Sequence, residues 1–200
     1  MKNLFALIAL ASLLSCNNDA ELRKTVSIPD TQFPELPQYS EWGYNTFGAY
    51  YGRQPFVANN NDVPLVITNH DNVTVFAFKG QLGQYSYSSN ASPFLLTLTF
   101  SEFHPETFED LLALNETSFD LTDPQIAIEI KDANNVIHSA EILEGQFQVK
   151  RAQLLLVDKE KQEVILSGVF DFQAIFDGEA VSVSEGRFDI GVAPNNFFKY

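Results

Sequence analysis

The residues from Val164 to Val192 read VILSGVFDFQAIFDGEAVSVSEGRFDIGV, and they carry the clearest local structural signal of the chain. Up to Phe176 the apolar side chains mostly share one parity and the polar side chains the other, a period of two that predicts a half-buried strand. Asp177-Gly178 is a tight-turn signal, and the apolar residues after it predict a returning strand. We therefore expect a long β-hairpin around which the other strands pair.

The returning arm of this hairpin changes register. Its apolar positions switch parity at Glu185-Gly186, and a glycine at such a switch predicts a β-bulge. Arg187 follows this glycine, with Glu185 and Asp189 close in sequence. We expect Arg187 to pair with a carboxylate and to fix the hairpin register, so that Arg187→Ala lowers thermal stability. The alternative is that Arg187 anchors an anionic ligand.

The rest of the chain repeats short strand patterns joined by turns. Alternating apolar runs occur at residues 73–78, 94–100, 126–130, 136–143 and 146–157. Residues 105–114 break the pattern and predict one short helix, with Phe108, Leu111 and Leu112 on one face. The predicted fold is all-β, an antiparallel β-barrel or β-sandwich of roughly 9–11 strands with one short helix, and a lipocalin-like barrel is one form of it. We expect one domain over residues 39–200.

Composition limits the partners of this domain. The chain has 200 residues, 18 Phe, 7 Tyr and a formal net charge of −14 at pH 7. Aromatic residues favour strands, and the length suits one domain with a real core. Negative charge argues against nucleic acid, because binding phosphates requires a positive field.

The N-terminus predicts export and lipid anchoring. Lys2 precedes an apolar run, Leu4 to Leu14, that is too short to span a bilayer. The run ends at Leu13-Leu14-Ser15-Cys16, which resembles the lipobox of bacterial lipoproteins. Cys16 is the only cysteine, so no intrachain disulfide can form. The resemblance implies a signal peptide over residues 1–15 and acylation of Cys16, for example with palmitate. Residues 16–38 then form the lipidated cysteine and a proline-stiffened tether.

Aromatic side chains are concentrated just after this tether. Four of them are candidates for a glycan-binding or other ligand-binding surface, namely Trp42, Tyr44, Tyr50 and Tyr51. Aromatic rings stack on sugar rings, and tyrosine and tryptophan also carry a polar group. The other interpretation is that these residues form the first strand and fill the core, which is the commoner use of aromatic-rich strands.

No pattern in the sequence has the mechanics of catalysis or of metal binding. His70, His104 and His138 are far apart and outside any HExxH pattern. Asp171, Glu185 and Asp189 could supply paired carboxylates for glycoside chemistry, although alternation along strands favours their facing solvent. We therefore expect no enzyme, no metal and no cofactor.

Two further stretches carry a resemblance to a family. Phe47 to Phe56 reads FGAYYGRQPF, and the later segments Ser167–Phe172 and Glu185–Ile190 read SGVFDF and EGRFDI. These segments resemble the opening and closing strands of Bacteroidota lipoproteins that carry a β-rich domain of unknown function. The resemblance spans roughly Trp42 to Val192 and implies a lipid-anchored β-domain of the cell envelope. The expected location is the outer membrane, with the domain facing either the periplasm or the cell exterior.

The expected function is therefore binding by a non-enzymatic envelope domain. The expected partners are the membrane, through the lipid anchor, and a glycan, an apolar small molecule or another envelope protein. Two other functions stay open, a carbohydrate-active enzyme and a purely structural envelope component. A closed barrel with an open apolar cavity would favour a small molecule, and a filled core with Trp42 and its neighbouring tyrosines exposed in a row would favour a glycan.

Overall fold

The fold is a single, strongly curved and mostly antiparallel sheet. A computed structural model describes residues 25–58, 63–70, 72–83, 92–157 and 160–200. The elements, in chain order, are β1 (Thr46–Tyr51), β2 (Gln54–Val57), β3 (Leu65–His70), β4 (Val73–Leu82), β5 (Ser92–Phe100), the 3-10 helix η3 (Phe108–Leu114), β6 (Thr117–Asp120), β7 (Ile126–Lys131), β8 (Ile137–Ser139), β9 (Glu141–Val157), β10 (Glu160–Phe176), β11 (Glu179–Val192) and β12 (Phe197–Lys199). The all-β prediction with one short helix is confirmed.

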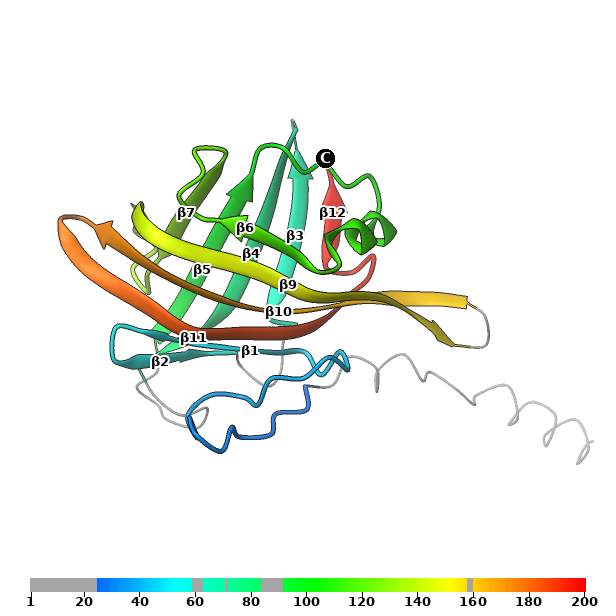
Figure 1. The fold of residues 1–200 in the computed structure, drawn as a ribbon, viewed down its shortest axis with the longest axis horizontal. Coiled ribbons are helices and arrows are strands. Elements are labelled where there is room, and N and C mark those ends of the chain that lie inside the picture. The colour runs from blue at the N-terminus through cyan, green and yellow to red at the C-terminus, as the bar shows by residue number, and fades with distance from the viewer. Residues whose placement is uncertain (1–24, 59–62, 71, 84–91, 158–159) are drawn as a thin grey trace, which may run out of the picture.

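The strand order of the described residues shows a sheet that does not close into a barrel. Ten of the 12 strands of the described chain run in the order β6-β9-β10-β11-β1-β2-β4-β5-β7-β8; off this path β3 pairs with β4, and β12 pairs with β3 in parallel. In Figure 1, β9, β10, β11 and β1 cross steeply over β3, β4, β5 and β7. The two halves of one sheet therefore face each other, as in an orthogonal β-sandwich. The strand number is slightly above the nine to eleven expected.

The predicted hairpin of β10 and β11 is confirmed, with its turn at Asp177-Gly178. Both turn residues have positive φ, 51° and 86°, as the tightest hairpin turns require. The bulge is also confirmed, because Phe170 pairs with Gly186 whereas Phe172 pairs with Val183. Two residues of β11, Ser184 and Glu185, thus lie opposite Asp171 alone.

Gly186 contributes to this bulge by its lack of a side chain and not by a left-handed backbone conformation. The left-handed residue is Glu185, with φ 54°, and not the glycine. A Cβ on Gly186 would lie 2.4 Å from the carbonyl oxygen of Phe170 and 2.6 Å from its ring. The glycine is required for close packing of the two strands at the bulge, where no larger residue fits.

Phenylalanine side chains fill the space between the two halves of the sheet. The Phe78 ring on β4 lies 4.9 Å from that of Phe47 on β1 and 5.4 Å from that of Phe188 on β11. The Phe147 ring on β9 stacks on Phe188 at 5.2 Å. All four side chains are at most 1% exposed. The core is therefore packed with rings that contact one another across the sheet, which adds to the free energy of burial.

The short helix covers one end of this core. It begins later than expected, at Phe108, and is a 3-10 helix in which Leu111 and Leu114 are buried whereas Leu112 is 36% exposed. The predicted face with Leu112 is therefore wrong, because a 3-10 helix has three residues per turn and aligns positions three apart. Within the described residues, no helix has the length and apolar character that crossing a membrane requires.

Candidate functional site

The outer face of β1, β10 and β11 is covered by an N-terminal segment, residues 25–45, which we call the strap. The prediction of a tether up to residue 38 is wrong for residues 25–38. Leu36 is 1% exposed, Val26 donates a backbone hydrogen bond to Tyr44, and Gln38 donates one to Ile28. Figure 1 shows the strap running beside β1 and β2. The folded body therefore extends to at least residue 25, well before residue 39.

Local sequence explains why the strap folds instead of extending. The Asp30 carboxylate accepts hydrogen bonds from the backbone of Gln32 (2.8 Å) and Phe33 (3.0 Å) and so forms a turn. These bonds lower the pKa of Asp30, which stays ionised. Pro37 packs directly over Gly48, where a Cβ would lie 2.5 Å from the proline ring. Prolines that would stiffen a free tether instead shape a loop that packs on β1.

Arg187 joins the strap to the bulge. Its guanidinium lies 2.8 Å from the Asp30 carboxylate and 2.9 Å from the Glu185 carboxylate, and its Nε donates to the Glu185 carbonyl at 3.0 Å. It also lies over the Phe33 ring, 5.5 Å from the centroid. The predicted ion pair is therefore confirmed. Because Arg187 holds Glu185 at two atoms, it stabilises the left-handed residue of the bulge.

Asp189 is the second attachment point of the strap. Its carboxylate accepts hydrogen bonds from the backbone of Trp42 (3.1 Å), Gly43 (2.8 Å) and Tyr44 (3.2 Å), as well as from the hydroxyls of Ser167 and Ser40. Asp189 is 1% exposed, so the expectation that it faces solvent is wrong. Its oxygens are occupied by the strap, which leaves it in a structural role rather than beside a second carboxylate in a cleft.

The four candidate aromatic residues do not form a row. Trp42 is 72% exposed, whereas Tyr44, Tyr50 and Tyr51 are half-buried. Tyr50 packs on Phe33 of the strap, and Tyr51 contacts Phe94 and Phe176 at the end of the core, on the opposite face of β1. Both interpretations of this stretch therefore hold in part: Tyr51 fills the core and Trp42 is presented to solvent.

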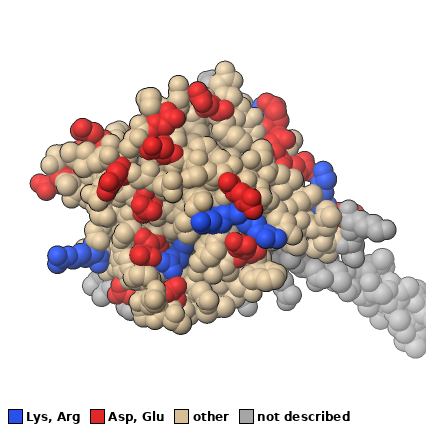
Figure 2. Space-filling model, viewed as in Figure 1, with Lys and Arg blue, Asp and Glu red and all other residues tan. Residues whose placement is uncertain are grey.

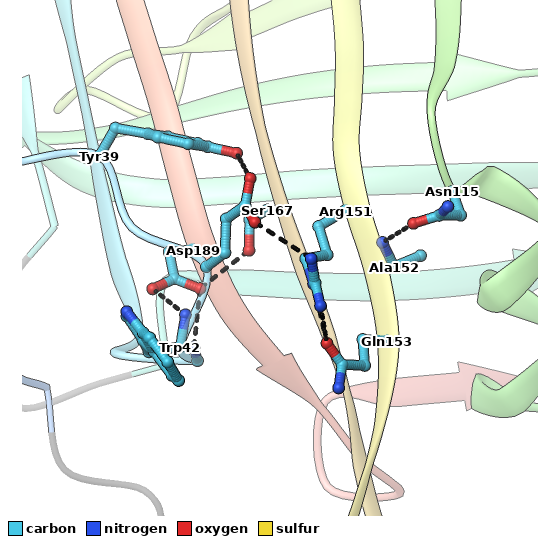
Figure 3. A network of polar contacts seen from close by, with 10 residues as sticks. Tyr39, Trp42, Asn115, Arg151, Ala152, Gln153, Ser167 and Asp189 are labelled. Atoms are coloured by element: carbon cyan, nitrogen blue, oxygen red, sulfur yellow. Dashed lines mark hydrogen bonds and ion pairs between the residues drawn. The ribbon is translucent and has the colours of Figure 1, made fainter.

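A polar network joins the strap to β9 on the outer face of the sheet, and in Figure 3 Trp42 lies on the other side of Asp189 from Arg151 and Gln153. The Tyr39 hydroxyl donates to the Glu41 carboxylate (2.9 Å), which lies 3.6 Å from the Arg151 guanidinium. Arg151 in turn donates to the Gln153 side chain at 2.8 Å. Burial, followed by the Glu41 carboxylate, raises the pKa of Tyr39, so the phenol stays protonated as a donor. We call Tyr39, Glu41, Trp42, Arg151 and Gln153 the Trp42 surface.

The register of the sheet determines the width of the Trp42 surface. Arg151 pairs with Ser167, and Ser167 pairs with Asp189, which holds the backbone of Trp42. Arg151 thus lies two strands, or about 10 Å, from the point where Trp42 is attached. The sequence predicted Trp42 but missed Arg151 and Gln153, whose spacing of two residues on β9 places both on the outer face.

The remaining candidate residues do not converge. The described residues contain no group of three or more His, Cys, Asp or Glu side chains that could hold a metal ion. His138 contacts the Asp177 carboxylate and lies 3.7 Å from that of Asp132, so it links the β10–β11 turn to the β7–β8 turn. The hydrogen bond to Asp177 is the largest factor that raises the pKa of His138. Cys16 and the predicted signal peptide lie outside the described residues. The lipidation of Cys16 stays a prediction.

A cavity of about 300 Å³ lies at the opening of the curved sheet, between β6 and the β5–β7 pair. Figure 2 shows how acidic the surface of this side of the molecule is, with few Lys and Arg among many Asp and Glu. The cavity is separate from the Trp42 surface, and the two sites share no residue.

Comparisons of the chain with models of protein families, with curated proteins and with solved structures found no match.

Proposed function

We propose that this chain is a lipid-anchored protein of the cell envelope, in the outer membrane, whose non-enzymatic β-domain binds a saccharide at the Trp42 surface. The anchoring part is supported by the position of Cys16, the only cysteine, directly after the apolar run that ends at Leu14. Its test is metabolic labelling of cells with a palmitate analogue. The label should mark the chain and should be lost in the Cys16→Ala variant, and a chain that carries no label contradicts anchoring.

The observation that carries the binding part is Trp42, an indole 72% exposed on a backbone that is held rigidly. The amides of residues 42, 43 and 44 all donate to the buried Asp189 carboxylate. A large aromatic side chain on a fixed backbone loses little conformational entropy when a ligand stacks on it. Such a side chain contributes more binding energy than one on a mobile loop.

The neighbours of Trp42 favour a saccharide over a purely apolar ligand. The Glu41 and Arg151 side chains are 36% and 47% exposed, so each can still reach a ligand. A sugar presents apolar C–H groups on one face of its ring and hydroxyl groups around the edge, so its ring could stack on the indole while its hydroxyl groups reach the polar side chains across Asp189. The span of about 10 Å across two strands suits one or two sugar rings.

The test is binding of the purified chain, carrying Cys16→Ser, to an array of envelope and plant-type glycans. Trp42→Ala should weaken binding to any glycan found by about tenfold or more, because the stacking surface is removed. Tyr200→Ala is the matched control, since Tyr200 is 76% exposed and away from this surface. Equal effects of the two variants, or an array on which nothing binds, would contradict saccharide binding.

A further inference from the structure

We propose that the cavity at the opening of the sheet is a second binding site, for a small apolar molecule that carries an amine. This goes beyond the proposed function, because the cavity and the Trp42 surface are formed by different strands. The cavity is lined by side chains of β5, β6, β7, the helix η3 and the turns between them, namely Phe100, Phe103, Ala113, Leu114, Phe119 and Ile126, with Glu102 and Asp123 at its edge.

The cavity exists because the sheet stays open at this point. β6 pairs with β9 on one side and with no other strand of the described chain. The inward side chains of β6, Thr117 and Phe119, are only half-buried, although Phe119 lies 5.0 Å from the Phe100 ring. The edge of the aromatic cluster is thus partly exposed here, at Phe119. A volume of about 300 Å³ is at the lower end of those of small-molecule sites.

The apolar body of the ligand follows from the rings that form the floor. Phe100 is 4% exposed and continues into the core through Phe147, with ring centroids 6.0 Å apart. Leu114 of the helix, 3% exposed, forms an adjoining wall. A flat aromatic body would therefore contact ring faces and aliphatic side chains together, and would leave the water at the opening.

The charge of the ligand follows from the edge of the cavity. Glu102 and Asp123 are exposed there, and the residues that line the cavity include no Lys or Arg. The Asp123 carboxylate accepts a hydrogen bond from the backbone of Gln125 at 2.9 Å, and neither carboxylate is in an ion pair with a described residue. Two carboxylates near an apolar opening attract an ammonium group and repel a carboxylate, so anions such as fatty acids are disfavoured.

The test uses two probes with the same aromatic body and opposite charge, 1-naphthylmethylammonium and 1-naphthoate. Both are titrated into the isotope-labelled full chain carrying Cys16→Ser, and backbone amide shifts are followed by NMR. The ammonium probe should bind at least about ten times more tightly than the naphthoate. Its shifts should be largest near Phe103, Phe119 and Ile126, with no change at Trp42. Equal affinities, shifts centred elsewhere, or no binding at millimolar concentration would overturn the proposal.

Two variants test the position and the charge separately. Ala113→Trp fills the cavity and should lower affinity for the ammonium probe at least tenfold, whereas Ala127→Trp, on an exposed position outside the cavity, should not. Glu102→Gln should reduce the preference for the ammonium over the naphthoate, and Glu179→Gln, at the far hairpin turn, should leave it unchanged. If Ala113→Trp does not fold, the Glu102→Gln result and the map of shifts in the unmodified chain still decide the question.

Discussion

The inner face of the β10–β11 hairpin is buried against the core, and its outer face is buried only where the strap covers it; the two are held by different chemistry. On the inner face Phe170 and Phe188 pack against other rings of the core, and Phe172 belongs to the same apolar cluster. On the outer face Arg187 and Asp189 hold the strap through an ion pair and hydrogen bonds, and Ser167 donates a hydrogen bond to Asp189. Apolar burial has no direction, so the inner face sets how stable the fold is. Hydrogen bonds require fixed partners, so the outer face determines where the strap lies and how Trp42 is presented.

The largest expected effect is on the inner face. Phe147→Ala removes a ring that is 0% exposed and contacts rings from both halves of the sheet. The free energy of unfolding should fall by about 3–5 kcal/mol, measured by chemical denaturation. Phe198→Ala, at a position 37% exposed, is the control and should change it little. A loss for Phe147→Ala as small as that of the control would contradict a continuous core.

The next effect is on the outer face, at Asp189. In Asp189→Asn an amide group replaces one carboxylate oxygen and meets the backbone N–H groups of the strap, so several hydrogen bonds to a charged group are lost. We expect about 2–3 kcal/mol lower stability, together with faster proteolytic cleavage within residues 25–45. Asp171→Asn is the control, because Asp171 is exposed opposite the bulge. Equal melting temperatures of the two variants would show that Asp189 does not hold the strap.

A smaller effect is expected for Arg187→Ala, which separates the strap from the bulge. The free energy of unfolding should fall by about 2 kcal/mol. This loss is smaller than for a fully buried ion pair, because the Asp30 side chain is 19% exposed. The double variant with Asp30→Asn should lose less than the sum of the two single variants, since both remove the same ion pair. If the losses of stability in the two single variants add up in the double variant, the Arg187–Asp30 ion pair contributes nothing. Arg53→Ala, at an exposed arginine, is the control.

The smallest effect concerns His138 and depends on pH. Contact with Asp177 raises the pKa of His138 above its ordinary value of 6.5, so folding favours the charged imidazole. The resulting stabilisation is complete below pH 6.5 and is lost as pH rises through the higher pKa of the folded state. The melting temperature of His138→Gln should therefore differ more from that of the unmodified chain at about pH 5 than at about pH 9. A difference that grows toward pH 9 would contradict this link between the two turns.

The inner face and its hairpin could be predicted from the sequence because period-two alternation reports burial on one side. The alternation from Phe170 to Phe176 is clear, and the turn and the bulge have their own residue signals. The strap could not be predicted in the same way. It is held by single polar residues on another strand, such as Asp189, and sequence alternation assigns such residues to solvent.

One signal of the strap is nevertheless present in the sequence. Val164, Ile165 and Leu166 are consecutive apolar residues, and all three are buried, as expected for a strand covered on both faces.

Most of the Trp42 surface depends on pairing across strands. Arg151 lies beside a bulge at Lys150 in the β9–β10 register, and this register cannot be derived from either strand alone.

The most direct test of this account is hydrogen exchange at the backbone amides of Trp42, Gly43 and Tyr44. Because all three donate to the buried Asp189 carboxylate, we predict that they exchange nearly as slowly as amides in the middle of β10. Exchange at the rate of exposed loops would show that residues 25–45 are not held on the sheet. In that case Trp42 would lack the rigid backbone on which the proposed saccharide site depends.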